Sequence, residues 1–277
     1  MTELGFIEIL KIILIGIVEG ITEWLPVSST GHMLLLDELV SLNATEEFKE
    51  MFFVVIQLGA ILAVVVMFWN KMFPFAFKGK PTVKKDVLWM WVKVAVACIP
   101  SAVLGLLLDD FLEEHFGHAV SIAVMLIAYG IAFILVERIN KKRTPKTEKL
   151  ADITFKTAIL IGLFQVLSMI PGTSRSGATI IGALIIGVSR TAAAEFTFFL
   201  ALPTMLGASA LKIFKHGLVF TSAEIIALLI GCAVAFAVSV IAIKFLMDFV
   251  KRHDFSAFGW YRIILGIVVV VWFLLAK

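Results

Sequence analysis

The stretch GIVEGITEWLPVSSTGH, residues 16–32, decides the fold of this chain because it places charged and hydroxyl side chains inside apolar sequence. A partial echo, GLFQVLSMIPGTSRSGAT, occupies residues 162–179. In each, a proline interrupts an apolar segment and a short apolar piece follows. Proline ends a helix, and the following piece is too short to span a bilayer. We therefore expect two re-entrant helical hairpins, at 4–39 and 155–188, with VSSTG as the first turn.

The composition predicts an all-α, polytopic integral membrane protein. The chain has 277 residues, of which 61% are hydrophobic and 16% charged, and its mean hydropathy is +1.03. A soluble domain is far less apolar. Apolar runs of about 18 or more residues indicate spanning helices, whereas barrel strands would show short segments of period two. The net charge of +3 is too small and too dispersed for a nucleic-acid partner.

The long apolar runs predict about six spanning helices in a single membrane domain. They lie near residues 52–69, 87–108, 119–138, 196–214, 222–248 and 258–276. A hairpin and three helices therefore occur twice, in repeat one (1–150) and repeat two (151–277). One constant offset aligns Glu47 with Glu195, and Leu58–Ala60 with Leu206–Ala208. An odd number of spans in each unit makes the repeats inverted relative to each other.

Charge asymmetry predicts the orientation. The connections Lys71–Lys85 and Lys141–Lys149 are basic, and the segment Asp109–Glu114 between spans is acidic. Because cytoplasmic loops are enriched in Lys and Arg, we expect the basic connections inside, the acidic one outside, and both termini outside. The hairpins then enter from opposite faces and their turns meet near the middle of the membrane. The basic segment Lys212–Lys215 would face outward, which counts against this arrangement.

Two acidic residues in the first hairpin require a compensating partner. Glu19 and Glu23 are four positions apart, so a helix places them on one face, where the two carboxylates repel each other and resist desolvation. A divalent cation, a shared proton or a basic residue such as Arg175 would compensate them, and carboxylate ligands favour Mg²⁺ or Ca²⁺. The alternative is that the carboxylates face water at the end of the helix.

The hydroxyl-rich turn and its histidine indicate a site for chemistry on an anion. Ser28, Ser29 and Thr30 precede a new helical stretch, where side-chain hydroxyls and backbone N–H groups suit an anion. His32 follows as a candidate nucleophile, general base or general acid. A histidine at the start of a helix can also be only a hydrogen-bonded structural group.

The second hairpin supplies a candidate phosphate clamp. Its substrate-binding candidates are Gly172, Thr173, Ser174, Arg175, Ser176 and Thr179. An arginine is costly in a bilayer interior, and its planar guanidinium matches phosphate oxygens. The alternative role of Arg175 is a structural ion pair with Glu19 or Glu23. Acids and an imidazole on one hairpin with a guanidinium on the other indicate phosphoryl transfer or phosphate-ester chemistry.

The motifs EGITEWLPVSSTGH and PGTSRSGAT resemble those of the bacterial undecaprenyl-diphosphate phosphatases of the bacitracin-resistance type. The likeness extends to Phe52–Trp69 and Glu195–Ala208 and so covers nearly the whole chain. It implies hydrolysis of undecaprenyl diphosphate to undecaprenyl phosphate and inorganic phosphate, which recycles the lipid carrier for peptidoglycan synthesis and confers resistance to bacitracin. It also implies a bacterial cell membrane protein whose active site opens to the periplasmic or extracellular side.

By motif position, the resemblance implies roles for particular residues. It places the family's acidic pair on Glu19 and Glu23, its histidine on His32 and its phosphate-binding arginine on Arg175. The hydroxyl-rich turn falls on Ser28, Ser29 and Thr30, and the serines beside the arginine are Ser174 and Ser176. The attacking group is Ser29 activated by His32, His32 itself, or water; we favour Ser29 with His32 as its acid–base partner.

Two other functions fit part of the pattern. Inverted repeats with broken helices are typical of alternating-access carriers, so a transporter or flippase of a lipid phosphate or small anion is the main alternative. A lipid-binding scaffold without turnover would explain the apolar surface but not the polar cluster. The expected partners are the polyprenyl diphosphate substrate and the bilayer, and we also consider a homodimer.

Overall fold

The computed structural model describes residues 4–76, 82–217 and 219–275. Parts of three predictions lie outside these residues: the first positions of repeat one, Lys78 and Lys80 of the first basic connection, and the end of the last predicted helix. The first half of the chain contains α1 (Phe6–Thr22), α2 (Ser29–Val40), α3 (Glu46–Val55), α4 (Gln57–Met67), α5 (Trp69–Met72), β1 (Phe75–Ala76), β2 (Thr82–Val83), α6 (Lys85–Phe116) and α7 (Ala119–Asn140). The second contains η1 (Leu150–Asp152), α8 (Phe155–Val166), η2 (Leu167–Met169), α9 (Arg175–Ile186), α10 (Arg190–His216), α11 (Ser222–Phe249) and α12 (Ser256–Leu275).

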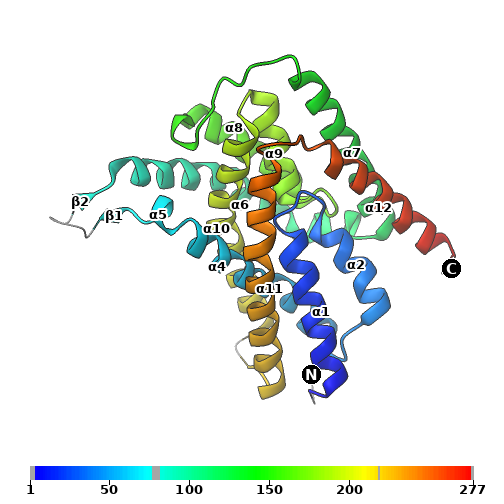
Figure 1. Ribbon diagram of the computed structural model, residues 1–277. Coiled ribbons are helices and arrows are strands. Elements are labelled where there is room, and N and C mark those ends of the chain that lie inside the picture. Colours follow the sequence, from blue (N-terminus) through cyan, green and yellow to red (C-terminus); the bar gives the residue numbers. More distant parts are fainter. Residues whose placement is uncertain (1–3, 77–81, 218, 276–277) are drawn as a thin grey trace.

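The described residues form an all-α, polytopic architecture, which confirms the predicted fold class. Six segments are long and apolar enough to cross a membrane: Glu46–Met67, Lys85–Leu108, Ala119–Asn140, Arg190–His216, Ser222–Phe249 and Ser256–Leu275. The first comprises α3 and α4, which are separated at Ile56. The strands β1 and β2 form only a short antiparallel pair at one edge of the molecule (Figure 1).

The acidic segment Asp109–Glu114 lies between two candidate spans, as the charge pattern suggested, but it is helical and not the loop that we expected. It forms the last turns of α6, which continues to Phe116. The residues from Leu106 to Phe116 include no glycine or proline. Since leucine and glutamate favour helix, the helix extends beyond its apolar span until Gly117.

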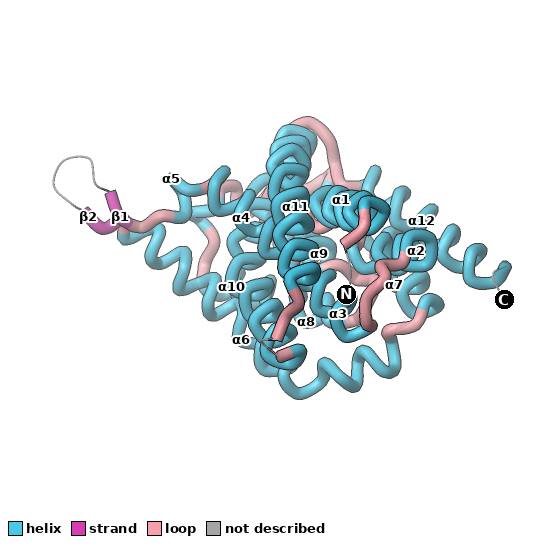
Figure 2. The backbone as a smooth tube through the Cα atoms, turned by 90° about the horizontal axis from the view of Figure 1, so that it is seen from below, coloured by secondary structure: helices cyan, strands magenta, loops and turns pink. Residues whose placement is uncertain are grey.

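Helix α9 lies at the centre of the fold. Nine of its residues are buried, and it contacts α7, α8 and α10 (Figures 1 and 2). Around it, α12 runs beside α7, α11 beside α1 and α4, and α8 beside α6. Two glycines permit the closest approaches: a Cβ at Gly59 would lie 2.0 Å from the carbonyl oxygen of Cys232, and one at Gly162 would lie 2.2 Å from that of Ala97.

Two pairs of short helices, α1–α2 and α8–α9, occupy the positions of the predicted hairpins. The helices of each pair contact each other. In Figure 1 the turn between α1 and α2, drawn in blue, lies at mid-height beside α9 rather than at an end of the molecule. Residues that are distant in the sequence are thereby brought together. That the pairs enter a bilayer without crossing it stays a prediction.

Candidate active site

The two hairpins start their second helices in the same way. Ser28 is the N-cap of α2 and Ser174 is the N-cap of α9. Their φ angles are 73° and 71°, and they are the positive-φ residues other than glycine in the described chain. Each side-chain oxygen accepts a hydrogen bond from the backbone N–H three residues later, at Gly31 or Gly177, with an N···O distance of 3.3 Å. This backbone conformation is sparsely populated, and such residues cluster at functional sites.

Glu23 joins the hairpins at their turns. Its Oε1 accepts a hydrogen bond from Nη2 of Arg175 at 2.9 Å, and its Oε2 accepts one from Oγ of Ser29 at 3.0 Å. Its backbone carbonyl accepts a third from Oγ of Ser176 at 3.2 Å. The carboxylate is buried, and removing one partner of such a pair leaves an uncompensated charge. Glu23, Ser29 and Arg175, which the sequence nominated separately, therefore form one cluster.

Glu19 has a carboxylate oxygen available for a ligand. The residue is 1% exposed, and Oε1 has no hydrogen-bond partner among the described residues. No three or more His, Cys, Asp and Glu side chains in the described ranges are grouped so as to hold a metal by themselves. Mg²⁺ typically takes one or two protein carboxylates and completes its shell with water and substrate phosphates. A buried, unpaired oxygen next to Glu23 on the helix fits that mode of binding.

The second hairpin holds its hydroxyls in a fixed network around Arg175. The guanidinium donates a second hydrogen bond, from Nη1 to the carbonyl of Thr197 at 3.1 Å, and lies over the ring of Trp24. Thr179 donates to the carbonyl of Arg175 at 2.9 Å and pairs with the Thr197 hydroxyl at 2.8 Å. Oγ of Ser174 and Oγ of Ser176 are 3.1 Å apart. Arg175 is thus oriented from several sides, as a phosphate-binding guanidinium requires.

Two buried polar groups in this turn are left without a protein partner. Nε of Arg175 and the buried hydroxyl of Thr173 have no hydrogen-bond partner among the described residues. Gly172, at φ +90°, lies against the backbone of Ile122, which any side chain would contact. Buried polar groups normally find partners, so two unpaired ones only two residues apart are candidates for contact with a bound anion.

His32 is not paired with Ser29 as the sequence led us to expect. Its Nδ1 is 2.7 Å from the carbonyl oxygen of Ser28, and its Nε2 is 2.7 Å from the hydroxyl of Tyr261, whose ring stacks on the imidazole. Both ring nitrogens of His32 therefore have other partners. The hydroxyl of Ser29 instead donates to the carboxylate of Glu23. The neighbouring hydroxyl residue, Thr30, is exposed.

Arg262 is, with Tyr261, a residue of α12 that the sequence reasoning missed. It is fully buried in α12 and donates to the carbonyls of both turns: Pro26 at 3.3 Å, Gly172 at 2.8 Å and Thr173 at 2.9 Å. Its guanidinium also lies over the ring of Tyr129. One signal was available, because Arg262 is an ionisable residue inside an apolar run, and such residues are functional candidates by default.

Comparison with known proteins identifies the family. The model of the family "Bacitracin resistance protein BacA" matches residues 12–268. The chain belongs to the BacA family. It is 70% identical to an undecaprenyl-diphosphatase of Enterococcus faecalis over 97% of this chain and 98% of the relative. It is 58% identical to undecaprenyl-diphosphatase 1 of Clostridium acetobutylicum, and 58% identical to an undecaprenyl-diphosphatase of Desulfitobacterium hafniense. Both matches cover at least 97% of this chain and 98% of each relative.

The BacA match includes the second hairpin, the first hairpin from residue 12 onward, and every candidate residue. It also includes Tyr261 and Arg262, which contact the candidate site from α12. The site therefore combines a carboxylate that contacts both a hydroxyl and a guanidinium with a second carboxylate, that of Glu19, one oxygen of which has no hydrogen-bond partner among the described residues. Such a set can bind phosphate oxygens and activate a hydroxyl.

Proposed function

We propose that this protein hydrolyses undecaprenyl diphosphate to undecaprenyl phosphate and inorganic phosphate. The names of the curated relatives and the BacA family support this activity. The reaction recycles the lipid carrier for peptidoglycan synthesis, and it confers bacitracin resistance by consuming the diphosphate that bacitracin sequesters. The observation that carries the proposal is the simultaneous contact of Glu23 with Arg175 and Ser29.

In the proposed mechanism, Arg175 leaves Glu23 for the substrate, and Glu23 becomes the base for Ser29. When the diphosphate binds, Arg175 turns its guanidinium to the phosphate oxygens, because the substrate carries more charge than one carboxylate. Glu23, released from its ion pair, accepts the proton of Ser29 as the hydroxyl oxygen attacks the terminal phosphorus. The phosphoanhydride bond breaks and undecaprenyl phosphate leaves. Glu23 passes the proton to the leaving phosphate and then accepts one from water, which attacks the phosphoserine; the bond from phosphorus to Oγ breaks, inorganic phosphate leaves, and Glu23 returns the proton to Ser29.

The remaining candidates orient the substrate. Glu19 and Glu23 would hold a divalent cation, Mg²⁺ or Ca²⁺, which supplies charge neutralisation for the diphosphate when bound. Thr173, Ser174, Ser176 and the N-terminus of α9 donate hydrogen bonds to phosphate oxygens. His32, tethered to the carbonyl of Ser28, holds the first turn in position.

The proposed orientation follows from the charge of the connections. The basic connection Lys141–Lys149 lies in the cytoplasm, the acidic end of α6 and both termini lie outside, and the active site opens to the outside. The turns of the two hairpins then meet within the membrane, and the polyprenyl chain follows the apolar helix faces into lipid. Labelling of single cysteines introduced at the termini and in this connection tests the assignment.

Phosphate release from a polyprenyl diphosphate by purified protein in detergent micelles tests the activity. Hydrolysis does not need two compartments, whereas a transporter or flippase does, so release in micelles separates the enzyme from its rival. We expect Ser29→Ala to lower turnover by about a thousandfold, while Ser41→Ala, at the other end of α2, retains it. With a substrate labelled in its terminal phosphate, acid quenching should trap label on wild-type protein.

Two results would contradict parts of this proposal. No phosphate release by well-folded wild-type protein would remove the enzymatic function. Normal turnover by Ser29→Ala, with no trapped label, would leave the function standing but assign the attack to water or His32.

A further inference from the structure

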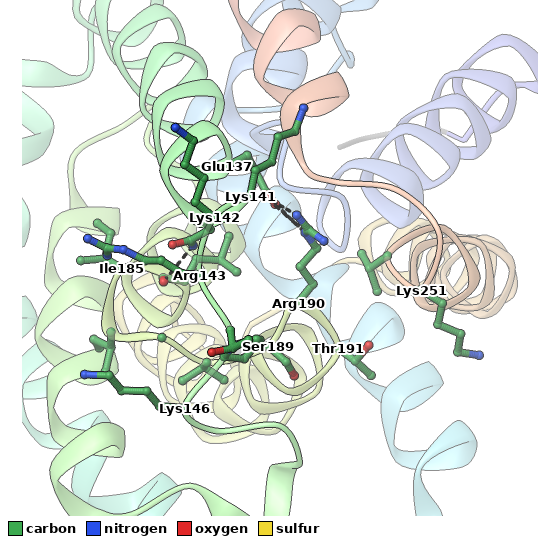
Figure 3. Close-up of a pocket in the computed structure, with 18 residues that line it drawn as sticks. Glu137, Lys141, Lys142, Arg143, Lys146, Ile185, Ser189, Arg190, Thr191 and Lys251 are labelled. Atoms are coloured by element: carbon green, nitrogen blue, oxygen red, sulfur yellow. Dashed lines mark hydrogen bonds and ion pairs between the residues drawn. The ribbon is translucent and has the colours of Figure 1, made fainter.

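A hollow of about 1010 Å³ lies at the far end of α9 from Arg175. Spanning helices α7 and α10 each have an end there, at Asn140 and Arg190, and the residues following α11, Val250 and Lys251, also line it (Figure 3). The hollow therefore lies at a boundary between membrane and water. Since α9 rises about 1.5 Å per residue, its last residues are about 15 Å from the active-site arginine, so the two sites are separate.

The lining is strongly cationic. It includes Lys141, Lys142, Arg143, Lys146, Arg190 and Lys251, and its acidic member is Glu137. Lys141 pairs with Asp254 and Lys251 with Asp248. The side chains of Lys142, Arg143 and Lys146 are exposed and make no ion pair with any described residue. Three uncompensated cations therefore share one concave surface.

Two charged residues of the hollow, Arg190 and Glu137, neutralise each other. Arg190 donates from Nη2 to Oε2 of Glu137 at 2.6 Å and from Nε to Oε1 at 2.9 Å, as drawn in Figure 3. The backbone N–H of Phe255 donates to the same carboxylate at 3.0 Å. Glu137 is fully buried, so its charge is satisfied by these donors and does not neutralise the rim.

The basic connection is held in shape around the hollow. The backbone N–H groups of Lys146 and Thr147 donate to the carbonyl of Gly187 at 2.7 and 3.2 Å, and that of Ser189 donates to Thr147 at 2.9 Å. Nδ2 of Asn140 donates to the carbonyl of Leu184 at 3.0 Å. The general excess of Lys and Arg in cytoplasmic loops explains the presence of these charges but not their arrangement on a segment bonded to the end of α9.

An apolar wall adjoins the cations. Ile185 and Ile186 line the hollow, and Ile185 is 47% exposed. An anionic lipid presents both complements, a phosphodiester for the cations and acyl chains for the isoleucines. We propose that this hollow binds the headgroup of an anionic glycerophospholipid, with its phosphodiester at Lys142, Arg143 and Lys146.

The test compares two variants that remove equal charge. In the first, Lys142, Arg143 and Lys146 are replaced by Gln; in the control, Lys85, Lys93 and Lys156, which do not line the hollow, are replaced by Gln. Full-length protein in detergent is titrated with short-chain phosphatidylglycerol and phosphatidylcholine, and bound lipid is counted by native mass spectrometry. With about 1 kcal/mol for each basic residue near an anionic headgroup, affinity for phosphatidylglycerol should fall about a hundredfold in the first variant. Phosphatidylcholine binding should not change.

Three outcomes would overturn the proposal. These are undiminished binding in the first variant, an equal loss in the control, and displacement of phosphatidylglycerol by an equal concentration of inorganic phosphate, which would indicate a small-anion site. If the triple variant does not fold, Arg143→Gln alone should weaken binding about fivefold. Phosphate release from the diphosphate substrate should be unaffected by any of these changes.

Discussion

The two hairpins share a backbone device but differ in burial and chemistry. Ser28 and Ser174 cap their helices with nearly equal φ angles and the same side-chain bond. Beyond the cap, α2 has two buried residues and a partly exposed Ser29, whereas α9 has nine buried residues and lies inside the bundle. The first hairpin carries carboxylates and a candidate nucleophile; the second carries a guanidinium held by a hydroxyl network.

This difference shows how one backbone device can serve two purposes. A buried helix such as α9 can orient an arginine with little rotational freedom, which suits binding of a phosphate. A less enclosed helix such as α2 can admit substrate and water to its hydroxyl. The predictions below test whether the second hairpin binds phosphate while the first supplies the reacting groups. They are given from the largest expected effect to the smallest.

Removing the guanidinium of the second hairpin should have the largest effect. We expect Arg175→Ala to lower phosphate release by about a thousandfold or more, because loss of an arginine that stabilises a transferring phosphoryl group has costs of this order. Arg175→Lys should recover part of the activity, since lysine restores the positive charge but not the planar, two-pronged set of N–H donors of the guanidinium. The control is Arg138→Ala, an exposed arginine of α7. Near-normal turnover in folded Arg175→Ala would show that the second hairpin is not the phosphate clamp.

Removing the hydrogen bonds by which Arg262 joins α12 to the turns of both hairpins should lower both the stability of the protein and its turnover. Arg262→Met leaves three turn carbonyls without their donor, which we expect to cost about 3 kcal/mol of unfolding free energy. Turnover should also fall by at least about tenfold, since small misplacement of catalytic groups has effects of this size. Thermal unfolding in detergent and phosphate release measure the two effects. A stability loss with unchanged turnover would mean that Arg262 supports the fold alone.

Replacing Glu19, whose carboxylate has an unpaired oxygen, should test whether the site binds a divalent cation. In Glu19→Gln we expect the Mg²⁺ concentration for half-maximal activity to rise by about tenfold or more, with a smaller change in turnover at saturating Mg²⁺. Chelation should abolish wild-type activity, and added Mg²⁺ or Ca²⁺ should restore it. Full activity of the wild-type protein in chelator would remove the metal from the proposal and leave a shared proton as the compensating charge.

Removing the hydrogen bond between His32 and Tyr261 should lower turnover the least. Tyr261→Phe removes one hydroxyl and its bond to Nε2, which should lower turnover by about threefold to tenfold, the cost of one hydrogen bond. His32→Gln should cost more, because it also removes the contact of Nδ1 with the carbonyl of Ser28. Equal losses in the two variants would indicate that His32 acts only through Tyr261.

Several features were accessible from the sequence because they depend on local pattern. Runs of apolar residues predict spanning helices by length alone, and the structure places candidate spans close to all six expected positions. The positions of the candidate residues followed from motifs such as EGITEWLPVSSTGH. The same local reasoning missed the length of α6, whose acidic end looked like a loop although its residues favour helix.

The sequence by itself determined the class of protein, the number of spans and the residues that carry charge within apolar segments. Tertiary structure alone decided which of them meet. Glu23 and Arg175 are 152 positions apart, and the His32–Tyr261 contact joins residues 229 positions apart. Local periodicity specifies which face of a helix a residue occupies, but not which helix packs against that face. That packing decides the partner of Ser29, the hydrogen bonds of Arg262 to both turns, and the cationic hollow.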